Sequence, residues 1–230
     1  MTRRRWGRAQ AASQIQTPGQ APYTNGQVAL APLMSEIAFM TDTHMKGALF
    51  VHMIGFAQQE LGEITAERII AALDLQSGGA YTAIGMYPLA EFGQLHDRFA
   101  AVMELEPAEF SRRLGHYALP ILVAMRDTDT GTHIFDFLEQ VHGVIHRDVR
   151  KLYKDASPPD VQVVARDGSD KLTLRYDSRR PMAAFCTGML EGALRVFDPQ
   201  GMYKMERVDP VPRRDNFAEF QLEWSCDNRN

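Results

Sequence analysis

The spacing of hydrophobic residues changes near residue 160, and this change limits the folds that the chain can adopt. Before that point, apolar residues recur every three or four positions, as they do along one face of a helix. Proline and glycine residues divide this part of the chain into separate helical segments. The segments predicted to be helical are 45–62, 66–75, one that starts at Pro88, one that starts at Pro107, and 135–152. Pro120 is expected either to kink the helix that starts at Pro107 or to begin the next one.

Beyond this change, apolar residues alternate with polar ones, which is the pattern of strands. Two runs, 161–165 and 171–178, flank the turn-forming D-G-S-D and predict a hairpin. An amphipathic helix at 182–196 and two more strands at 202–208 and 217–224 follow. Helices followed by strands with one inserted helix predict an α+β fold, with N-terminal helices plus a C-terminal antiparallel sheet of about four strands.

The first 44 residues differ from the rest of the 230-residue chain. Four arginines open it, and a stretch rich in Gln, Ala, Pro and Gly follows, with too few aliphatic residues to build a core. No apolar run follows the basic start, so the pattern does not match a signal peptide. We expect residues 1–44 to be either a disordered extension or a mis-assigned start, with translation beginning at a later methionine such as Met34, Met40 or Met45. We expect residues 45–230 to form one domain.

The overall composition argues against several classes of protein. The net charge of -4 argues against a nucleic-acid partner, which requires a basic surface. No apolar run approaches the roughly 20 residues that span a bilayer, so no membrane partner is expected. The two cysteines, Cys186 and Cys226, cannot form a disulfide framework, which favours a cytoplasmic protein. We expect no enzymatic activity, because we find no nucleophile with a base, phosphate-binding loop or dinucleotide fingerprint.

The end of the second predicted strand carries hydrogen-bond donors at every second position. Tyr176, Ser178 and Arg180 therefore share one face of the strand. All three side chains can donate, and the planar guanidinium suits a carboxylate or a phosphate. This pattern predicts an anion site, although an exposed strand end would also explain it.

The predicted helix at 135–152 carries His142 and His146, which are four residues apart and therefore neighbours on one side. They could be ordinary packed or half-exposed histidines. They could instead be a paired-imidazole metal site, although the spacing alone is a weak signal without a neighbouring Glu. A third interpretation makes one of them the proximal ligand of a haem iron.

Several motifs, in this order, resemble the haem-nitric oxide/oxygen binding (H-NOX) domains, which are related to the haem domain of soluble guanylate cyclase. They are M-K-G at 45–47, Y-T-A-I-G-M-Y-P at 81–88, the 135–159 segment that ends in A-S-P-P, Y-x-S-x-R at 176–180, and G-M-L-E-G at 188–192. The resemblance covers essentially all of 45–230. It implies haem b held between the helices and the sheet.

The resemblance also implies roles for individual residues. Tyr176, Ser178 and Arg180 match the residues that bind the two haem propionates. His146 matches the proximal iron ligand, because nine residues separate it from A-x-P-P, as in the family. Pro159 matches the proline that presses on the macrocycle and distorts it.

The residues above the iron determine which gas is bound. Family members that hold dioxygen carry a tyrosine where this chain has Phe185, supported by polar residues at the positions of Met53 and Ala118. Leu49 and Met189 would complete an apolar distal pocket, which favours nitric oxide over dioxygen. Tyr117 or His116 would overturn this expectation by turning into the pocket.

The expected function is therefore that of a stand-alone haem-based nitric oxide sensor that also binds CO. Nitric oxide would weaken the bond between His146 and the iron, and the conformational change would regulate a partner in trans, a histidine kinase or a diguanylate cyclase/phosphodiesterase. Two alternatives are a dioxygen or redox haem sensor, and a non-haem metalloprotein that uses His142 and His146.

Overall fold

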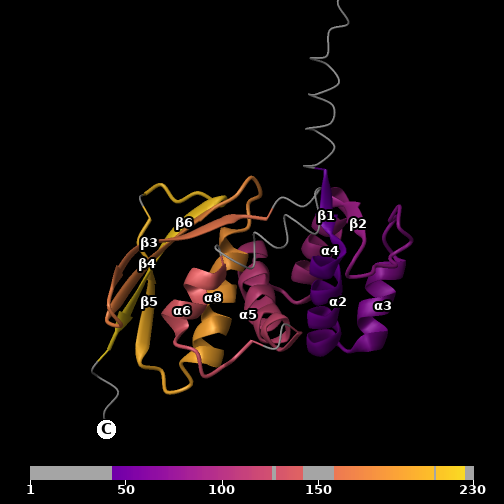
Figure 1. Ribbon diagram of the computed structural model, residues 1–230. Helices are drawn as coiled ribbons and strands as arrows, with labels where there is room; N and C mark the ends of the chain where they lie inside the picture. Colours follow the sequence, from indigo (N-terminus) through magenta and orange to yellow (C-terminus); the bar gives the residue numbers. More distant parts are fainter. Residues whose placement is uncertain (1–42, 126–127, 142–157, 210, 226–230) are drawn as a thin grey trace, which may run out of the picture.

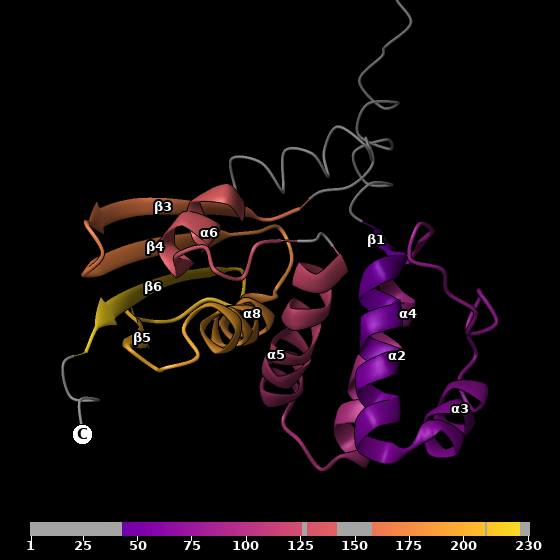
Figure 2. The ribbon, with the colours of Figure 1, turned by 60° about the horizontal axis from the view of Figure 1, so that its bottom comes forward.

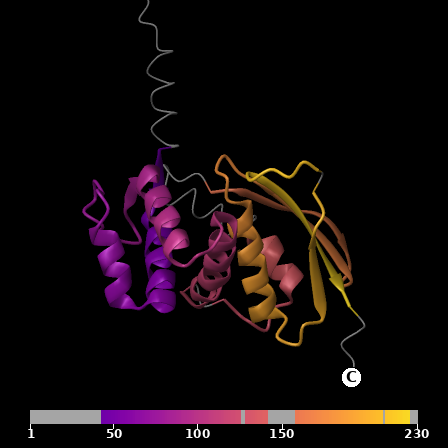
Figure 3. The ribbon, with the colours of Figure 1, turned by 180° about the vertical axis from the view of Figure 1, so that it is seen from behind.

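The computed structural model describes residues 43–125, 128–141, 158–209 and 211–225 (Figure 1). It confirms the predicted α+β class, with helices first and an antiparallel sheet later in the chain. The first helices of the chain lie at one end of the molecule and the sheet lies at the other (Figures 1 and 3). Between them lie α5 (Pro107–Met125) and α8 (Ala183–Phe197). None of the described helices is both long and apolar enough to cross a bilayer.

The N-terminal part consists of helices packed around aromatic side chains. Its elements are α2 (Gly47–Leu61), α3 (Glu63–Ala71), α4 (Leu89–Val102) and α5 (Pro107–Met125). Phe50 is fully buried at the centre, where its ring stacks on Tyr81 at 4.5 Å and meets Phe92 edge-on at 5.3 Å. Such aromatic contacts stabilise the core beyond the burial of their surface.

A two-stranded antiparallel sheet, absent from the sequence prediction, joins the start of this part to its middle. It pairs β1 (His44–Lys46) with β2 (Met86–Pro88). Each strand has only three residues, too few to show an alternating pattern. The pairing places the residues just before α2 beside those just before α4.

Three predicted helix boundaries in this part differ from the structure. The second helix begins at Glu63 rather than at residue 66, because Gly62 with a φ of 82° ends α2 and α3 starts at once. Pro88 is the N-cap of α4 rather than its first residue. Pro120 neither ends α5 nor starts another helix, since α5 continues through it to Met125.

The four strands of the C-terminal part form a second antiparallel sheet, in the order β3-β4-β6-β5. They are β3 (Asp160–Asp167), β4 (Lys171–Asp177), β5 (Tyr203–Arg207) and β6 (Phe217–Trp224), close to the predicted ranges. Alternate residues of the two central strands are buried on one face, and α6 (Ile134–Gln140) and α8 (Ala183–Phe197) cover that face (Figure 2). These buried residues are Leu172, Leu174, Tyr176, Ala218, Phe220 and Leu222.

The helix predicted at 135–152 is described only over its first part. Its start is confirmed by α6, which His133 caps by accepting a hydrogen bond from the Phe135 backbone N–H at 3.1 Å. His142 and His146 lie outside the described residues.

Helices α5 and α8 approach each other unusually closely, because glycines line their contact. A Cβ added at Gly188 would overlap the Arg112 carbonyl oxygen, and one at Gly115 would overlap the Phe185 carbonyl oxygen. Arg112 also joins the helices through an ion pair with Glu191, Nη1 to Oε2 at 2.6 Å. Backbone contact rather than side-chain interdigitation therefore sets the distance between these helices.

Replacement of Gly188 by alanine should destabilise the protein, because the backbones must separate to admit the methyl group. We expect Gly188→Ala to lower the free energy of unfolding by about 1–3 kcal/mol in denaturant titrations. Gly93→Ala is the matched control, because a Cβ at this helical glycine meets nothing within 4 Å. It should raise the free energy of unfolding by about 0.5–1 kcal/mol. Equal effects of the two substitutions would contradict the role of close approach.

Candidate functional site

A cavity of about 310 Å³ lies between the helical part and the sheet-containing part. Pockets for small molecules and cofactors have volumes of roughly 300–1,000 Å³, so this cavity is at the lower end of that range. Most of its described lining is apolar, whereas its few polar side chains come from β1 and from the end of β4. The apolar lining includes Ala48, Leu49, Met86, Leu119, Leu122, Phe137, Leu138, Val141, Val161, Met182, Phe185, Met189, Leu190 and Ala193.

Tyr176, Ser178 and Arg180 all line the cavity. β4 ends at Asp177, so Ser178 and Arg180 follow the strand rather than belong to it. The Ser178 backbone N–H still donates to the Asn216 carbonyl at 2.9 Å, which keeps the segment beside the sheet. The Ser178 hydroxyl accepts a hydrogen bond from the Arg180 backbone N–H at 3.1 Å.

The charge and protonation states of these side chains suit an anion. Burial raises the pKa of the Tyr176 hydroxyl, which therefore remains a donor at neutral pH. The Arg180 guanidinium donates from Nη2 to the His44 carbonyl oxygen at 2.8 Å. This bond joins residues 136 positions apart and connects β1 to the segment after β4.

The described residues that flank the segment 142–157 in the sequence line the cavity. These are Val141 before the segment, and Pro158 and Pro159 after it, directly before β3. His146, five residues after Val141, lies outside the described residues. The described residues contain no group of three or more His, Cys, Asp or Glu side chains that could hold a metal ion.

Three of the five predicted distal residues line the cavity and two do not. Leu49, Phe185 and Met189 contribute to the lining. Met53 is fully buried in the aromatic core of the helical part, and Ala118 is fully buried on α5. On α5, Leu119 and Leu122 line the cavity instead.

The lining residues of α5 and α6 have no feature in the sequence that distinguishes them from core residues. Phe137, Leu138, Leu119 and Leu122 lie on helices whose apolar residues serve both the core and the cavity. Periodicity identifies a buried face but does not separate these two roles. For α8 a signal was present, because Met182, Phe185 and Met189 share one apolar stripe and all three line the cavity.

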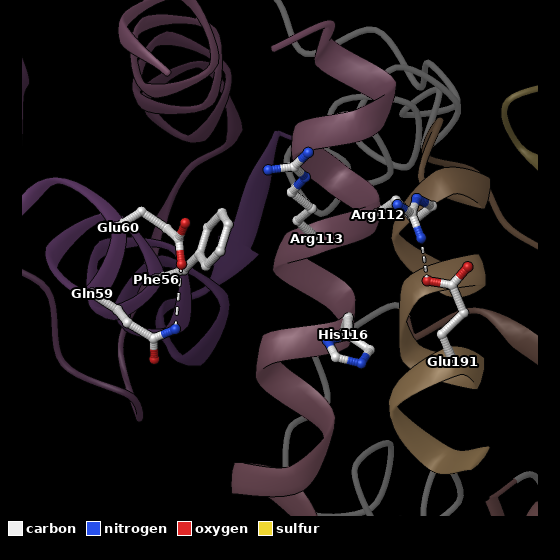
Figure 4. A pocket seen from close by; sticks show the side chains of 7 residues that line it. All are labelled: Phe56, Gln59, Glu60, Arg112, Arg113, His116 and Glu191. Carbon is white, nitrogen blue, oxygen red and sulfur yellow. Dashed lines mark hydrogen bonds and ion pairs between the residues drawn. The ribbon is translucent and has the colours of Figure 1, made fainter. Parts of the chain in front are cut away.

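Neither Tyr117 nor His116 is among the residues that line the cavity. The Tyr117 ring packs on Phe56 at 5.6 Å, and a Cβ added at Gly55 would lie 2.8 Å from the Tyr117 hydroxyl oxygen. The absence of a side chain at Gly55 thus makes room for this hydroxyl beside α2. His116 lines a second hollow, shown in Figure 4.

This second hollow is a groove of about 520 Å³ between α2, α5 and α8. Its other lining residues are Phe56, Gln59, Glu60, Arg112, Arg113 and Glu191 (Figure 4). Arg112 bonds Glu191 across the groove wall and Glu109 within α5. Hydrogen bonds from Arg112 and Arg113 lower the pKa of Glu109 to about 2. Much of the positive charge is therefore matched by carboxylates of the same chain.

The sequence comparison identifies the family to which this chain belongs. A family model described as haem-NO-binding matches residues 46–204. The chain belongs to the haem-NO-binding family. Members of this family are haem-based gas sensors. No curated protein sequence matches the chain.

Solved H-NOX structures have the same fold as this member of the haem-NO-binding family. The unliganded Fe(II) protein from K. algicida is 23% identical, with a TM-score of 0.66 over 79% of this chain and 97% of that one. The Fe(II)CO protein from Shewanella woodyi is 26% identical, with a TM-score of 0.66 over 79% and 95%. The Fe(II)NO protein from S. oneidensis is 18% identical, with a TM-score of 0.64 over 79% and 99%.

Cys186 also lines the cavity, and its burial makes the thiol a poor nucleophile. Burial raises its pKa from 9.0 to about 12. Because the thiolate is the reactive form, its population near pH 8 falls by roughly a thousandfold. Cys226 lies outside the described residues.

In a Cys226→Ser background, alkylation of Cys186 by iodoacetamide at pH 8 should therefore be at least about a hundredfold slower in the folded protein than in denaturant. The rate should rise as the pH is raised toward 12, because the thiolate becomes populated. Mass spectrometry of quenched samples measures both rates. Rapid alkylation of the folded protein would show that the thiol is accessible and ionised.

Proposed function

We propose that this chain binds haem b in the cavity and uses it to sense nitric oxide. The observation that carries the proposal is the distribution of polarity among the described lining residues, most of which are apolar, whereas the donors Tyr176, Ser178 and Arg180 lie together. Haem b has a corresponding shape, with an apolar macrocycle and two carboxylates on one edge. Tyr176, Ser178 and Arg180 would bind these carboxylates through neutral and charge-assisted hydrogen bonds.

We infer that His146 would be the residue that binds the haem iron. Val141 and Pro158 line the cavity, and His146 belongs to the segment between them, which supports this role. Pro159 would then press on the macrocycle from the same side. The resemblance of the 135–159 segment to the family pattern gives the same assignment.

The apolar residues of the predicted distal pocket that line the cavity favour nitric oxide over dioxygen. Ferrous haem supplies tight binding of nitric oxide without a distal donor, whereas dioxygen is held by one. Leu49, Phe185 and Met189 present no hydrogen-bond donor, and Tyr117 packs beside α2. Carbon monoxide needs no donor either and would be a second ligand.

Signalling would pass through the elements on either side of His146. The segment that contains this residue begins after α6 and ends at β3, which both pack in the sheet-containing core. Nitric oxide would weaken the bond between His146 and the iron. The segment that contains His146 would then be held less firmly, and this change would reach α6 and β3. A ligand that favours one of two conformations in this way can regulate a partner. We propose a histidine kinase or a diguanylate cyclase/phosphodiesterase, acting in trans, as that partner.

Absorption spectra of the reduced, haem-loaded protein under argon, air and nitric oxide test the proposal. The Soret band should be unchanged by brief exposure to air and should shift under nitric oxide. A stable new spectrum under air would reveal a donor in the cavity and overturn the selectivity. The absence of any Soret band after haem reconstitution would overturn haem binding itself.

Introduction of a donor at Phe185 should change the selectivity. We expect Phe185→Tyr to bind dioxygen and to release it at least roughly tenfold more slowly than Phe185→Leu, because a hydrogen bond to a charged group contributes about 1.5–3 kcal/mol. Phe185→Leu is the control for a changed side chain at this position, since it introduces no donor. Stopped-flow measurements give the dissociation rates. Equal rates would show that position 185 does not face the bound gas.

A further inference from the structure

The segment that carries Ser178 and Arg180 is attached at two points to the chain just before β6. The Ser178 backbone N–H donates to the Asn216 carbonyl at 2.9 Å, and the Ala183 backbone N–H donates to the Asp215 carbonyl at 2.7 Å. Arg180 lies between these two attachments in the sequence. Two consecutive carbonyls therefore set the path of the chain from the end of β4 to the start of α8.

The two carbonyls belong to a turn, residues 214–217, at the start of β6. Arg214 and Phe217 pair as a single antiparallel bridge, which places Asp215 and Asn216 at the tip of the turn. Because the tip accepts both hydrogen bonds from the anion-binding segment, a group that holds the turn also holds that segment.

Arg207, at the end of β5, holds both ends of this turn with one guanidinium group. Its Nη2 donates to the carbonyl oxygens of Arg214 and Phe217, both at 2.9 Å. The same guanidinium is paired with Asp209, Nε to Oδ1 at 2.5 Å and Nη2 to Oδ2 at 3.1 Å. A planar guanidinium with five donors can bind a carboxylate and backbone carbonyls at once.

The ion pair between Arg207 and Asp209 is largely shielded from water. The side chain of Arg207 is 19% exposed and that of Asp209 is 1% exposed. Burial alone would raise the pKa of Asp209, but the hydrogen bond from Arg207 and its charge hold that pKa below its usual value. Asp209 is therefore charged at neutral pH and keeps the guanidinium in place.

Arg207 also lies close to the cavity without lining it. Burial raises the pKa of the lining residue Cys186, and the positive charge of Arg207 acts in the opposite direction. Arg207 itself is not among the described residues that line the cavity. It would therefore act on a ligand in the cavity through the residues that it holds.

We propose that Arg207 is a positioning residue for the anion-binding segment. Through the turn it fixes the backbone on both sides of Arg180, so that Ser178 and Arg180 are preorganised for the carboxylates of the cofactor. This inference rests on the proposed function. Tyr176 does not depend on the clamp, because it pairs with Ala218 inside the sheet.

Hydrogen exchange tests the first step, in which Arg207 holds the segment. In the full-length protein as purified, Arg207→Met should exchange the Ser178 and Ala183 amide hydrogens at least roughly tenfold faster than the unchanged protein, because the turn that accepts them is no longer held. The ratio to the exchange rate of the Leu174 amide, inside β4, corrects for any change in overall stability. NMR spectroscopy resolves the individual amides.

A second variant and a control accompany this measurement. Loss of Arg207 alone leaves the buried Asp209 carboxylate without its cation, which destabilises the fold. The double variant Arg207→Met/Asp209→Asn removes both charges and should show the same fast exchange at the two amides. Arg175→Met is the matched control, because it removes an ion pair with Glu219, Nε to Oε1 at 2.9 Å, from the same sheet without touching the turn. It should leave the exchange of both amides unchanged.

The second step, from the segment to the cofactor, is tested with haem and with its dimethyl ester, whose carboxylates carry no charge. Each protein is loaded with either cofactor and mixed with an excess of a high-affinity haem acceptor, and transfer is followed by absorbance. The double variant should release haem roughly tenfold faster than the unchanged protein. It should release the dimethyl ester within about twofold of the unchanged rate, because Ser178 and Arg180 then have no charged carboxylate to bind.

The outcomes separate this inference from the proposed function. Unchanged exchange at Ser178 and Ala183 in both variants would show that Arg207 does not hold the segment, and the haem sensor would stand without this role. Equal acceleration of haem and ester release would show a general loss of stability and overturn the positioning role. If the unchanged protein retains no haem, the proposed function fails, and the role of Arg207 in cofactor binding fails with it.

Discussion

The close backbone contact between α5 and α8 is the constraint on which the rest of the molecule depends. Helix α5 contributes Phe110 and Leu114 to the aromatic core of the helical part, and Leu119 and Val123 to the core under the sheet. It is therefore the one described helix whose buried residues belong to both cores. Because glycines hold α8 directly against it, the cavity residues of α8 have a fixed position relative to both parts.

The sequence predicted secondary structure well where the pattern of apolar residues lies within one short segment. Alternating apolar residues located all four strands of the sheet within a few positions, and the helical stripe located α8. Strands β1 and β2 were missed because each has three residues and the pairing joins segments about 40 positions apart. Pro120 does not begin a new helix, because α5 continues through it at the cost of one helix hydrogen bond.

At the candidate site, the local sequence identified the hydrogen-bond donors but not all of the apolar residues that line the cavity. Tyr176, Ser178 and Arg180 were selected from their spacing alone, and the structure brings them to one cavity. Met53 and Ala118 were selected by resemblance and lie outside its lining. The lining residues His44 and Met86 belong to the paired strands β1 and β2, which the sequence did not predict.

The bond between Arg180 and the His44 carbonyl has a consequence for the order of assembly. The two residues close a loop of 136 positions, so the polar end of the cavity is complete only after most of the chain has emerged from the ribosome. Long loops close late, because their ends must find each other against chain entropy. Cofactor capture should therefore follow folding of both cores, and a chain stopped before Arg180 would have no complete site to fill.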